Sequence, residues 1–262
     1  MSRNFELLQQ AGLGPGGFPG KLGMPVSVIP TAETRVKGED RAFVASLEPA
    51  DLDRAAREEM LRLVHSIFLL RDRTESGSVV VFAAVDSGSG CSSICRQASQ
   101  VLAQSVPGSV CLVDANFREP TLPSAFGVGN HHGLADALRT SEPIQDYAKL
   151  VQGENLWLLS CGSHVAQSAG LLHSERMKKR IADLREQFDY VMIDAPPLNS
   201  YSEGVALGQF ADGLVLVLEA NSTRRDATAR IAERLHSMQV QILGAVLNKR
   251  TFPIPASLYR RL

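Results

Sequence analysis

The sequence contains no hydrophobic run long enough to cross a membrane. Its longest apolar stretches, Val79–Val85 and Gly213–Leu218, have the length of strands, whereas a membrane-spanning helix needs roughly 20 residues. No apolar core follows the first residues, so we expect no secretory signal. Cysteine is scarce as well, and the few present show neither the spacing of a metal site nor a dense disulfide pattern: Cys91, Cys95, Cys111 and Cys161. We therefore expect a cytosolic protein with reduced thiols.

Neither sign of charge is in excess. The 27 lysines and arginines nearly cancel the 28 aspartates and glutamates, so net charge gives no general affinity for nucleic acid or membranes. We expect no nucleic-acid partner. The 44% hydrophobic and 21% charged content is that of a soluble globular protein, and 262 residues suit a single large α/β domain.

The N-terminal part of the chain differs in composition from the rest. Residues 11–20 are rich in glycine and proline and have no apolar period, which predicts a flexible tail over residues 1–45. Within this tail, residues 24–30 would lie on the domain as an extended arm. Residues 46–262 are expected to form one domain.

Short apolar strands alternate with helical segments from residue 49 onward. We expect strands at 79–85, 109–113, 156–160, 190–193, 213–218 and 242–246. Helices are expected at 49–70, 92–104, 134–139, 174–187, 203–209 and 224–238. The strands are continuous runs of valine, isoleucine and leucine, which is typical of a sheet buried on both faces. We predict a doubly wound α/β fold with a mostly parallel sheet, and ligands at the carboxyl ends of the strands.

Three strand ends carry residues suited to phosphate chemistry. The turn after the first strand contains Gly88 and Gly90 and leads into a helix, a layout that directs backbone N–H groups at a phosphate. Such a turn alone is more often only a tight connection. Asp114 and Asp194 each close a buried strand, where a carboxylate is well placed to hold Mg²⁺. Although a strand-terminal aspartate often only caps a turn, two of them beside the glycine turn favour a nucleotide site.

The order of these motifs resembles the cytoplasmic kinase domain of the bacterial tyrosine-kinase (BY-kinase) family of capsule and exopolysaccharide synthesis, which is part of the MinD/ParA-like P-loop proteins. The similarity covers residues 55–262. It consists of a degenerate Walker A motif, a Walker A′ motif, a Walker B motif, a Gly-Leu-x-Asp-x-Leu segment and a late strand ending in asparagine: 88–93, 112–120, 191–197, 133–138 and 244–249. The resemblance implies a P-loop NTPase-like fold of the MinD/ParA type.

The resemblance also implies a site for ATP or ADP with Mg²⁺. The implied nucleotide-binding residues are Gly88, Ser89, Gly90, Cys91, Ser92, Ser93 and Asn248. Ser92, Asp114 and Asp194 are the implied metal-binding residues, and Asp114, Asp194 and Arg118 the implied catalytic ones. A retained activity would transfer the γ-phosphoryl group of ATP to a tyrosine. Tyr259, in the C-terminal tail, is the candidate phosphoacceptor, with an amphipathic anchor as the alternative role.

Assembly and partners follow from the resemblance in the same way. The helix before the loop contains Glu59-x-x-Arg62-x-x-His65, two of the three positions of the motif with which the family builds rings of subunits. Alone, such a pair is an ordinary solvated helix face. The resemblance implies a homo-oligomer and a partner of the membrane polysaccharide co-polymerase or chain-length type. That partner would hold the protein peripherally at the inner membrane.

The chain departs from the family pattern where phosphate is bound. Cys91 replaces the Walker A lysine, Asn116 replaces the second aspartate of Walker A′, and Asp86 stands where a related subfamily has an additional lysine. A neutral thiol cannot balance phosphate charge, and losing one electrostatic donor costs on the order of 10²–10³ in rate. Arg96, one helical turn further on, is expected to be a surface residue. We predict a degenerate kinase (pseudokinase) with weak or regulatory nucleotide binding.

Other functions stay open beside this one. A non-enzymatic scaffold of a polysaccharide-export complex would need the fold but no nucleotide. A MinD/ParA-type ATPase is disfavoured by Asp86 and by the Glu59/Arg62 helix. A phosphatase is disfavoured because Arg96 does not have the required spacing from Cys91. The adjacent histidines at 131–132 have no acidic or cysteine partner at the spacing of a metal site, so we predict that they lie in a loop.

Overall fold

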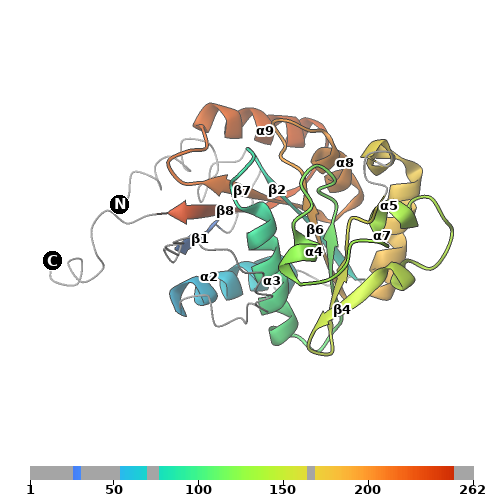
Figure 1. Ribbon diagram of the computed structural model, residues 1–262. Coiled ribbons are helices and arrows are strands. Elements are labelled where there is room, and N and C mark those ends of the chain that lie inside the picture. Colours follow the sequence, from blue (N-terminus) through green and yellow to red (C-terminus); the bar gives the residue numbers. More distant parts are fainter. Residues whose placement is uncertain (1–25, 31–53, 70–76, 164–168, 251–262) are drawn as a thin grey trace, which may run out of the picture.

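The computed structural model describes residues 26–30, 54–69, 77–163 and 169–250 (Figure 1). Most of the predicted tail and Tyr259 lie outside these residues, so the boundary between tail and domain stays a prediction. Among the described residues, no helix combines the length and apolar character needed to cross a membrane.

One sheet of eight strands forms the centre of the domain (Figure 1). In chain order its strands are β1 (Val26–Pro30), β2 (Ser78–Ala84), β3 (Val110–Asp114), β4 (Ala148–Gln152), β5 (Leu156–Leu159), β6 (Tyr190–Ala195), β7 (Gly213–Glu219) and β8 (Ile242–Arg250). Across the sheet the order is β1-β8-β7-β2-β6-β3-β5-β4. All neighbours pair in parallel except β4 and β5. The predicted doubly wound, mostly parallel α/β fold is thereby confirmed.

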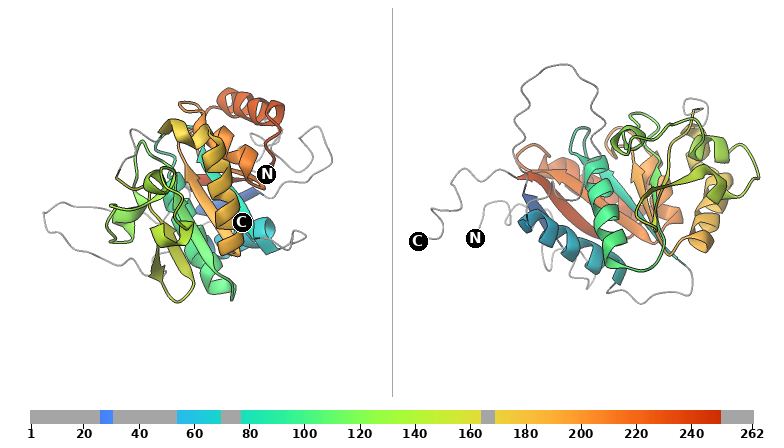
Figure 2. Two further views of the ribbon diagram at one scale, coloured as in Figure 1. Left: turned by 90° about the vertical axis from the view of Figure 1, so that its right-hand side faces the viewer. Right: turned by 60° about the horizontal axis from the view of Figure 1, so that its bottom comes forward.

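Helices cover both faces of the sheet (Figures 1 and 2). They are α2 (Arg54–Val64), α3 (Cys91–Ser105), α4 (Leu122–Ala125), α5 (Leu134–Ala137), α7 (Glu175–Gln187), α8 (Glu203–Phe210) and α9 (Arg225–Ser237). A π-helical turn continues α2, and two 3₁₀ turns precede β4 and α7: His65–Leu69, Ile144–Tyr147 and Ala169–His173. All six predicted strands and all six predicted helices have counterparts here within the described residues.

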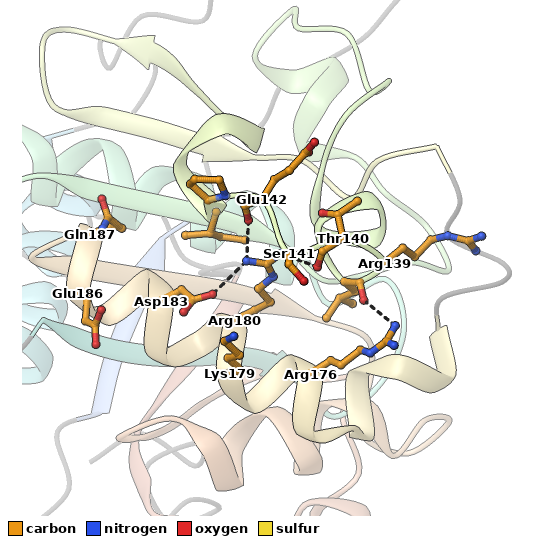
Figure 3. A pocket seen from close by; sticks show the side chains of 13 residues that line it. Arg139, Thr140, Ser141, Glu142, Arg176, Lys179, Arg180, Asp183, Glu186 and Gln187 are labelled. Carbon is orange, nitrogen blue, oxygen red and sulfur yellow. Dashed lines mark hydrogen bonds and ion pairs between the residues drawn. The ribbon is translucent and has the colours of Figure 1, made fainter.

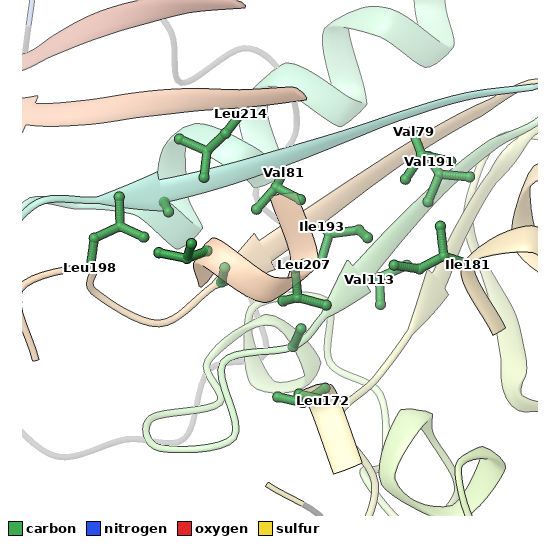
Figure 4. Packing of buried hydrophobic residues seen from close by; sticks show 14 of the residues in the cluster. Val79, Val81, Val113, Leu172, Ile181, Val191, Ile193, Leu198, Leu207 and Leu214 are labelled. Carbon is green, nitrogen blue, oxygen red and sulfur yellow. The ribbon is translucent and has the colours of Figure 1, made fainter. Parts of the chain in front are cut away.

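The alternation of side chains along the central strand explains why both faces need a cover. On β2, Val79 and Val81 point into the cluster that includes Ile181 of α7 and Leu207 of α8 (Figure 4). Phe82, with Val80, belongs to the opposite cluster, which α2 and α3 complete. Each fully buried side chain of this size contributes about 1.5–3 kcal/mol relative to its exposed state. Both layers are therefore required for the sheet to be stable.

Two strands lie at the edges, where the sequence pattern is weakest. β4 was not predicted, because it is short and its Leu150 remains 47% exposed, so no buried run marks it. Its antiparallel pairing with β5 completes one edge. At the other edge β1 pairs with β8 in parallel, in agreement with the extended arm expected at residues 24–30.

Candidate nucleotide site

The turn between β2 and α3 has the backbone of an anion-binding loop. Gly88 and Gly90 have φ angles of 79° and 80°, in the left-handed region that favours glycine. Gly90 precedes the first residue of α3, and no described side chain caps this helix terminus. The N–H groups of the first helical turn are therefore available to a ligand, and the helix dipole favours an anion there.

Side-chain hydrogen bonds hold this loop in place. The Asn248 amide donates to the Ser89 carbonyl at 2.8 Å. Ser89 in turn donates through its hydroxyl to the Asp86 carbonyl at 2.8 Å. The Asp86 carboxylate accepts a hydrogen bond from the Asn199 amide at 2.6 Å. The loop is thus fixed from the ends of β6 and β8, and Asn199 is a contributor that the sequence did not indicate.

We expect Gly90→Ala to destabilise the protein more than Gly88→Ala. Both positions need a positive φ, which costs an alanine roughly 1–2 kcal/mol. Only at Gly90 would the added methyl group also meet the Asn248 amide nitrogen, at 2.5 Å, whereas at Gly88 nothing lies within 4 Å. Urea unfolding should show a loss about 1 kcal/mol larger for Gly90→Ala.

Gly170→Ala is the control for these two variants. Its added methyl group would enter open space without a positive φ, so its free energy of unfolding should stay within about 0.5 kcal/mol of the wild type. Equal losses at Gly88 and Gly90 would contradict a rigid contact between Gly90 and Asn248.

Two aspartates lie side by side at the carboxyl end of the sheet. β3 and β6 are neighbours in the sheet, and their register places Asp114 opposite Asp194. Both side chains are buried. One carboxylate oxygen of Asp114 and both of Asp194 have no hydrogen-bond partner among the described residues. The other oxygen of Asp114 accepts the backbone N–H of Asn116 at 3.2 Å.

The burial of this pair makes the charged forms unfavourable. Burial, followed by the charge of Asp194, raises the pKa of Asp114 to about 8. Burial likewise raises the pKa of Asp194 to about 6. The side chains of Ser92 and Cys91 lie close enough to lower this pKa in part, although neither forms a hydrogen bond of normal geometry with the Asp194 carboxylate. Unpaired carboxylate oxygens beside a hydroxyl are the donors that Mg²⁺ prefers. The predicted set Ser92, Asp114 and Asp194 therefore fits a hard divalent cation.

Cys91 occupies the first position of α3 and is partly buried. Burial, followed by the neighbouring carboxylate of Asp194 and the thiol of Cys95, raises its pKa well above the usual value of a thiol. Its side chain is therefore a neutral thiol rather than a thiolate. A thiol in this state is a poor nucleophile, which argues further against a phosphatase.

Arg118 is held by two neighbours at the start of α8. Its guanidinium donates to the Glu203 carboxylate at 2.9 Å and lies over the Tyr201 ring, 4.7 Å from the ring centroid. Glu203 is buried, while the Arg118 side chain remains 45% exposed. The structure therefore places Arg118 in an ion pair between the segments that follow β3 and β6. Arg96 donates to Gln100 on α3.

The other sequence motifs lie apart from this loop. Glu59 and Arg62 form an ion pair of 2.5 Å on α2, and the Arg62 side chain is 70% exposed. In the Gly-Leu-x-Asp-x-Leu segment, the Gly133 N–H donates to the Asp136 carboxylate at 3.1 Å, so this motif shapes the start of α5. The two histidines at 131–132 lie in a bend, which agrees with the predicted loop. The described residues contain no cluster of three side chains that could hold a metal ion.

A pocket of about 430 Å³ lies elsewhere, between α7 and the segment 138–144 (Figure 3). The buried Arg180 organises its wall by donating to the carbonyls of Ala137, Thr140 and Glu142 and by pairing with Asp183. None of the predicted nucleotide-site residues lines this pocket. Arg176 and Arg180 hold the segment 138–144 on α7 by donating to its backbone carbonyls.

Sequence comparisons find relatives among bacterial tyrosine-protein kinases. No protein-family model matches the sequence. The tyrosine-protein kinase YwqD of Bacillus subtilis (strain 168) is 27% identical over 208 residues, covering 79% of this chain and 86% of the relative. The putative tyrosine-protein kinase CapB of Staphylococcus aureus is 22% identical over 219 residues, covering 84% and 96%.

Solved structures share the fold. The kinase domain of the Escherichia coli tyrosine kinase ETK superposes with a TM-score of 0.75 and 23% identity, covering 89% of this chain and 94% of that one. The septum site-determining protein MinD of Pyrococcus horikoshii, in complex with Mg-ADP, has a TM-score of 0.58 and 20% identity, covering 71% and 76%.

The sheet order and the loop of this chain agree with an α/β fold of the P-loop type. Its relatives in sequence are bacterial tyrosine-protein kinases, and its structural neighbours are the kinase domains of such enzymes and MinD-like P-loop proteins. The predicted resemblance is confirmed in both respects.

Proposed function

We propose that this protein binds ADP or ATP with Mg²⁺ and acts in bacterial capsule or exopolysaccharide synthesis as a degenerate member of the tyrosine-kinase group. One observation carries the proposal. A glycine loop and a helix terminus without a side-chain cap lie beside two buried aspartates, three of whose carboxylate oxygens have no partner within the described part of the chain. This arrangement is costly in an empty protein and favourable with a metal-bound phosphate.

Different residues would bind the phosphates and the metal ion. The backbone of 88–93 would receive the phosphates through N–H groups, and Asn248 fixes the loop that presents them. Ser92, Asp114 and Asp194 would hold Mg²⁺, which when bound supplies positive charge to the phosphates. Support also comes from relatives that are named tyrosine-protein kinases and from a neighbour solved with Mg-ADP.

The kinase step itself is expected to be weak. Cys91 is neutral and stands where the resemblance places the phosphate-binding lysine. The backbone N–H of Asn116 donates to the Asp114 carboxylate, and its side-chain oxygen accepts the N–H of Glu119. Because Asn116 is an amide, it adds no carboxylate to the metal site. A retained activity would phosphorylate a tyrosine, with Tyr259 as the candidate acceptor.

Assembly is part of the proposal. The exposed Arg62 on α2 is available for contacts with a second copy of the chain if its pairing with Glu59 is exchanged. We propose a homo-oligomer that works with a membrane polysaccharide co-polymerase or chain-length protein. The family resemblance and the Glu59–Arg62 pair on α2 support this assignment. Light scattering on the purified protein tests the oligomer.

Calorimetric titration of the wild-type protein tests the proposed function directly. We expect ADP to bind in the presence of Mg²⁺ and to lose most of its affinity in EDTA, because the three orphan carboxylate oxygens then face phosphate without a cation. A parallel assay for phosphotyrosine measures residual kinase activity. Affinity that is the same with and without Mg²⁺ would contradict the metal site.

A scaffold function is the second candidate, and the neutral Cys91 favours it. A pure scaffold would bind no nucleotide under any of these conditions but would still assemble. The same titration and light-scattering measurements therefore separate the two functions.

A further inference from the structure

Lys249, at the end of β8, contacts the phosphate loop directly, although the motif at 244–249 implied a role only for its neighbour Asn248. Its ammonium group donates to the Gly88 carbonyl at 2.6 Å. The preceding residue, Asn248, donates to the Ser89 carbonyl at 2.8 Å. Two consecutive residues of β8 thus hold two consecutive carbonyls of the loop.

The backbone at Lys249 is unusual for its residue type. Its φ angle is 54°, in the left-handed region, which a lysine adopts only when its surroundings compensate the cost. The Glu219 carboxylate, at the end of the neighbouring strand β7, lies 3.3 Å from the ammonium group. The Ala220 N–H also donates to the Asn248 carbonyl at 2.9 Å. The ends of β7 and β8 therefore fix Lys249 over the loop.

Fixing these carbonyls also fixes the direction of the N–H groups. In a planar trans peptide the N–H points opposite to the carbonyl of the same peptide unit, and no described peptide bond is cis. The carbonyls of Gly88 and Ser89 share their peptide units with the N–H groups of Ser89 and Gly90. Holding both carbonyls on the β8 side turns both N–H groups to the opposite side, where successive N–H groups form an anion-binding concavity.

We propose that Lys249 is a positioning residue of the nucleotide site: together with Asn248 it sets the loop N–H groups of Ser89 and Gly90 toward the phosphates. The inference rests on the proposed function for its ligand, a nucleoside diphosphate or triphosphate. It explains how a loop with a neutral residue at Cys91 keeps a conformation suited to an anion.

Amide hydrogen exchange in the nucleotide-free protein tests the clamp. Lys249→Asn removes the ammonium group and tolerates the left-handed φ, so we expect the amides of Ser89 and Gly90 to exchange about ten-fold faster. Lys249→Arg should stay within about three-fold of the wild type, because it keeps a cationic donor. Lys149→Asn is the matched control, since Lys149 donates to the Gly129 carbonyl at 2.9 Å in a different loop. Unchanged exchange in Lys249→Asn would overturn the clamp.

Titration with ADP and Mg²⁺ tests the link to the ligand. We expect Lys249→Asn to bind about ten-fold more weakly than the wild type and Lys249→Arg to recover most of this loss, with Lys149→Asn unchanged. Equal affinities of wild type and Lys249→Asn would overturn the role in binding. If the wild type binds no nucleotide, the proposed function fails, and the exchange experiment still decides whether Lys249 positions the loop.

Discussion

Cys91→Lys is expected to increase the affinity for ATP with Mg²⁺ and to raise tyrosine phosphorylation by on the order of 10²–10³. The position is the first residue of α3, next to the loop glycines and beside the carboxylate of Asp194. A lysine there would add a positive charge where phosphate charge is received, and low-dielectric surroundings increase the strength of such a charge. Calorimetry measures the affinity, and transfer of radiolabelled phosphate from ATP to the protein measures the rate.

Cys91→Met is the matched control for this experiment. Methionine provides a long unbranched side chain without charge, so it separates the effect of charge from that of filling space. We expect it to bind nucleotide no better than the wild type. If Cys91→Lys gains affinity for nucleotide without any gain in phosphorylation, the fold has kept the nucleotide pocket and the protein functions in assembly. No nucleotide binding even by Cys91→Lys would contradict the proposed nucleotide site.

Much of this site could be predicted from the sequence because its parts lie at strand ends. Continuous apolar runs identify β3 and β6 as buried parallel strands, and such strands end at one edge of the sheet. Asp114 and Asp194 are the last or nearly last residues of those strands, so their meeting follows from the fold class once the strands are neighbours. The loop glycines follow in the same way from the strand that precedes them.

The contacts that hold the loop could not be predicted. Asn199 reaches Asp86 across 113 residues of sequence, and Lys249 reaches Gly88 across 161 residues. No local pattern marks such pairs, since they depend on the order of β2, β6, β7 and β8 in the sheet. Arg118 is similar: the resemblance implied a catalytic role for it, but its ion pair with Glu203 arises only from the packing of α8.

Asp194→Asn is expected to stabilise the protein in the absence of metal while removing its metal-dependent binding of nucleotide. In the wild type both carboxylate oxygens of Asp194 are buried opposite Asp114, and neither has a hydrogen-bond partner in the part of the chain that the structure describes. A neutral amide removes one buried charge of this pair, which we expect to raise the free energy of unfolding by about 1–3 kcal/mol in EDTA. Thermal unfolding should rise by several degrees, since 1 kcal/mol corresponds to about 2–4 °C in a domain of this size.

The pH dependence of this effect has a definite sign. The pKa of Asp194 is raised from 3.8 in the ordinary state to about 6 in the fold. The wild type therefore gains stability from this group below pH 3.8 and loses it as the pH rises through 6. Asp194→Asn lacks this loss, so the difference between the two proteins should grow from acidic to neutral pH.

The control is Asp146→Asn, which changes an exposed carboxylate in the 3₁₀ turn before β4. It should alter neither the unfolding temperature nor the affinity for ADP with Mg²⁺. A destabilised Asp194→Asn variant would mean that the carboxylate is satisfied in the empty protein and that the metal site was inferred in error. A more stable variant that no longer responds to Mg²⁺ would show that stability is given up at this position because the carboxylate is needed for a bound cation.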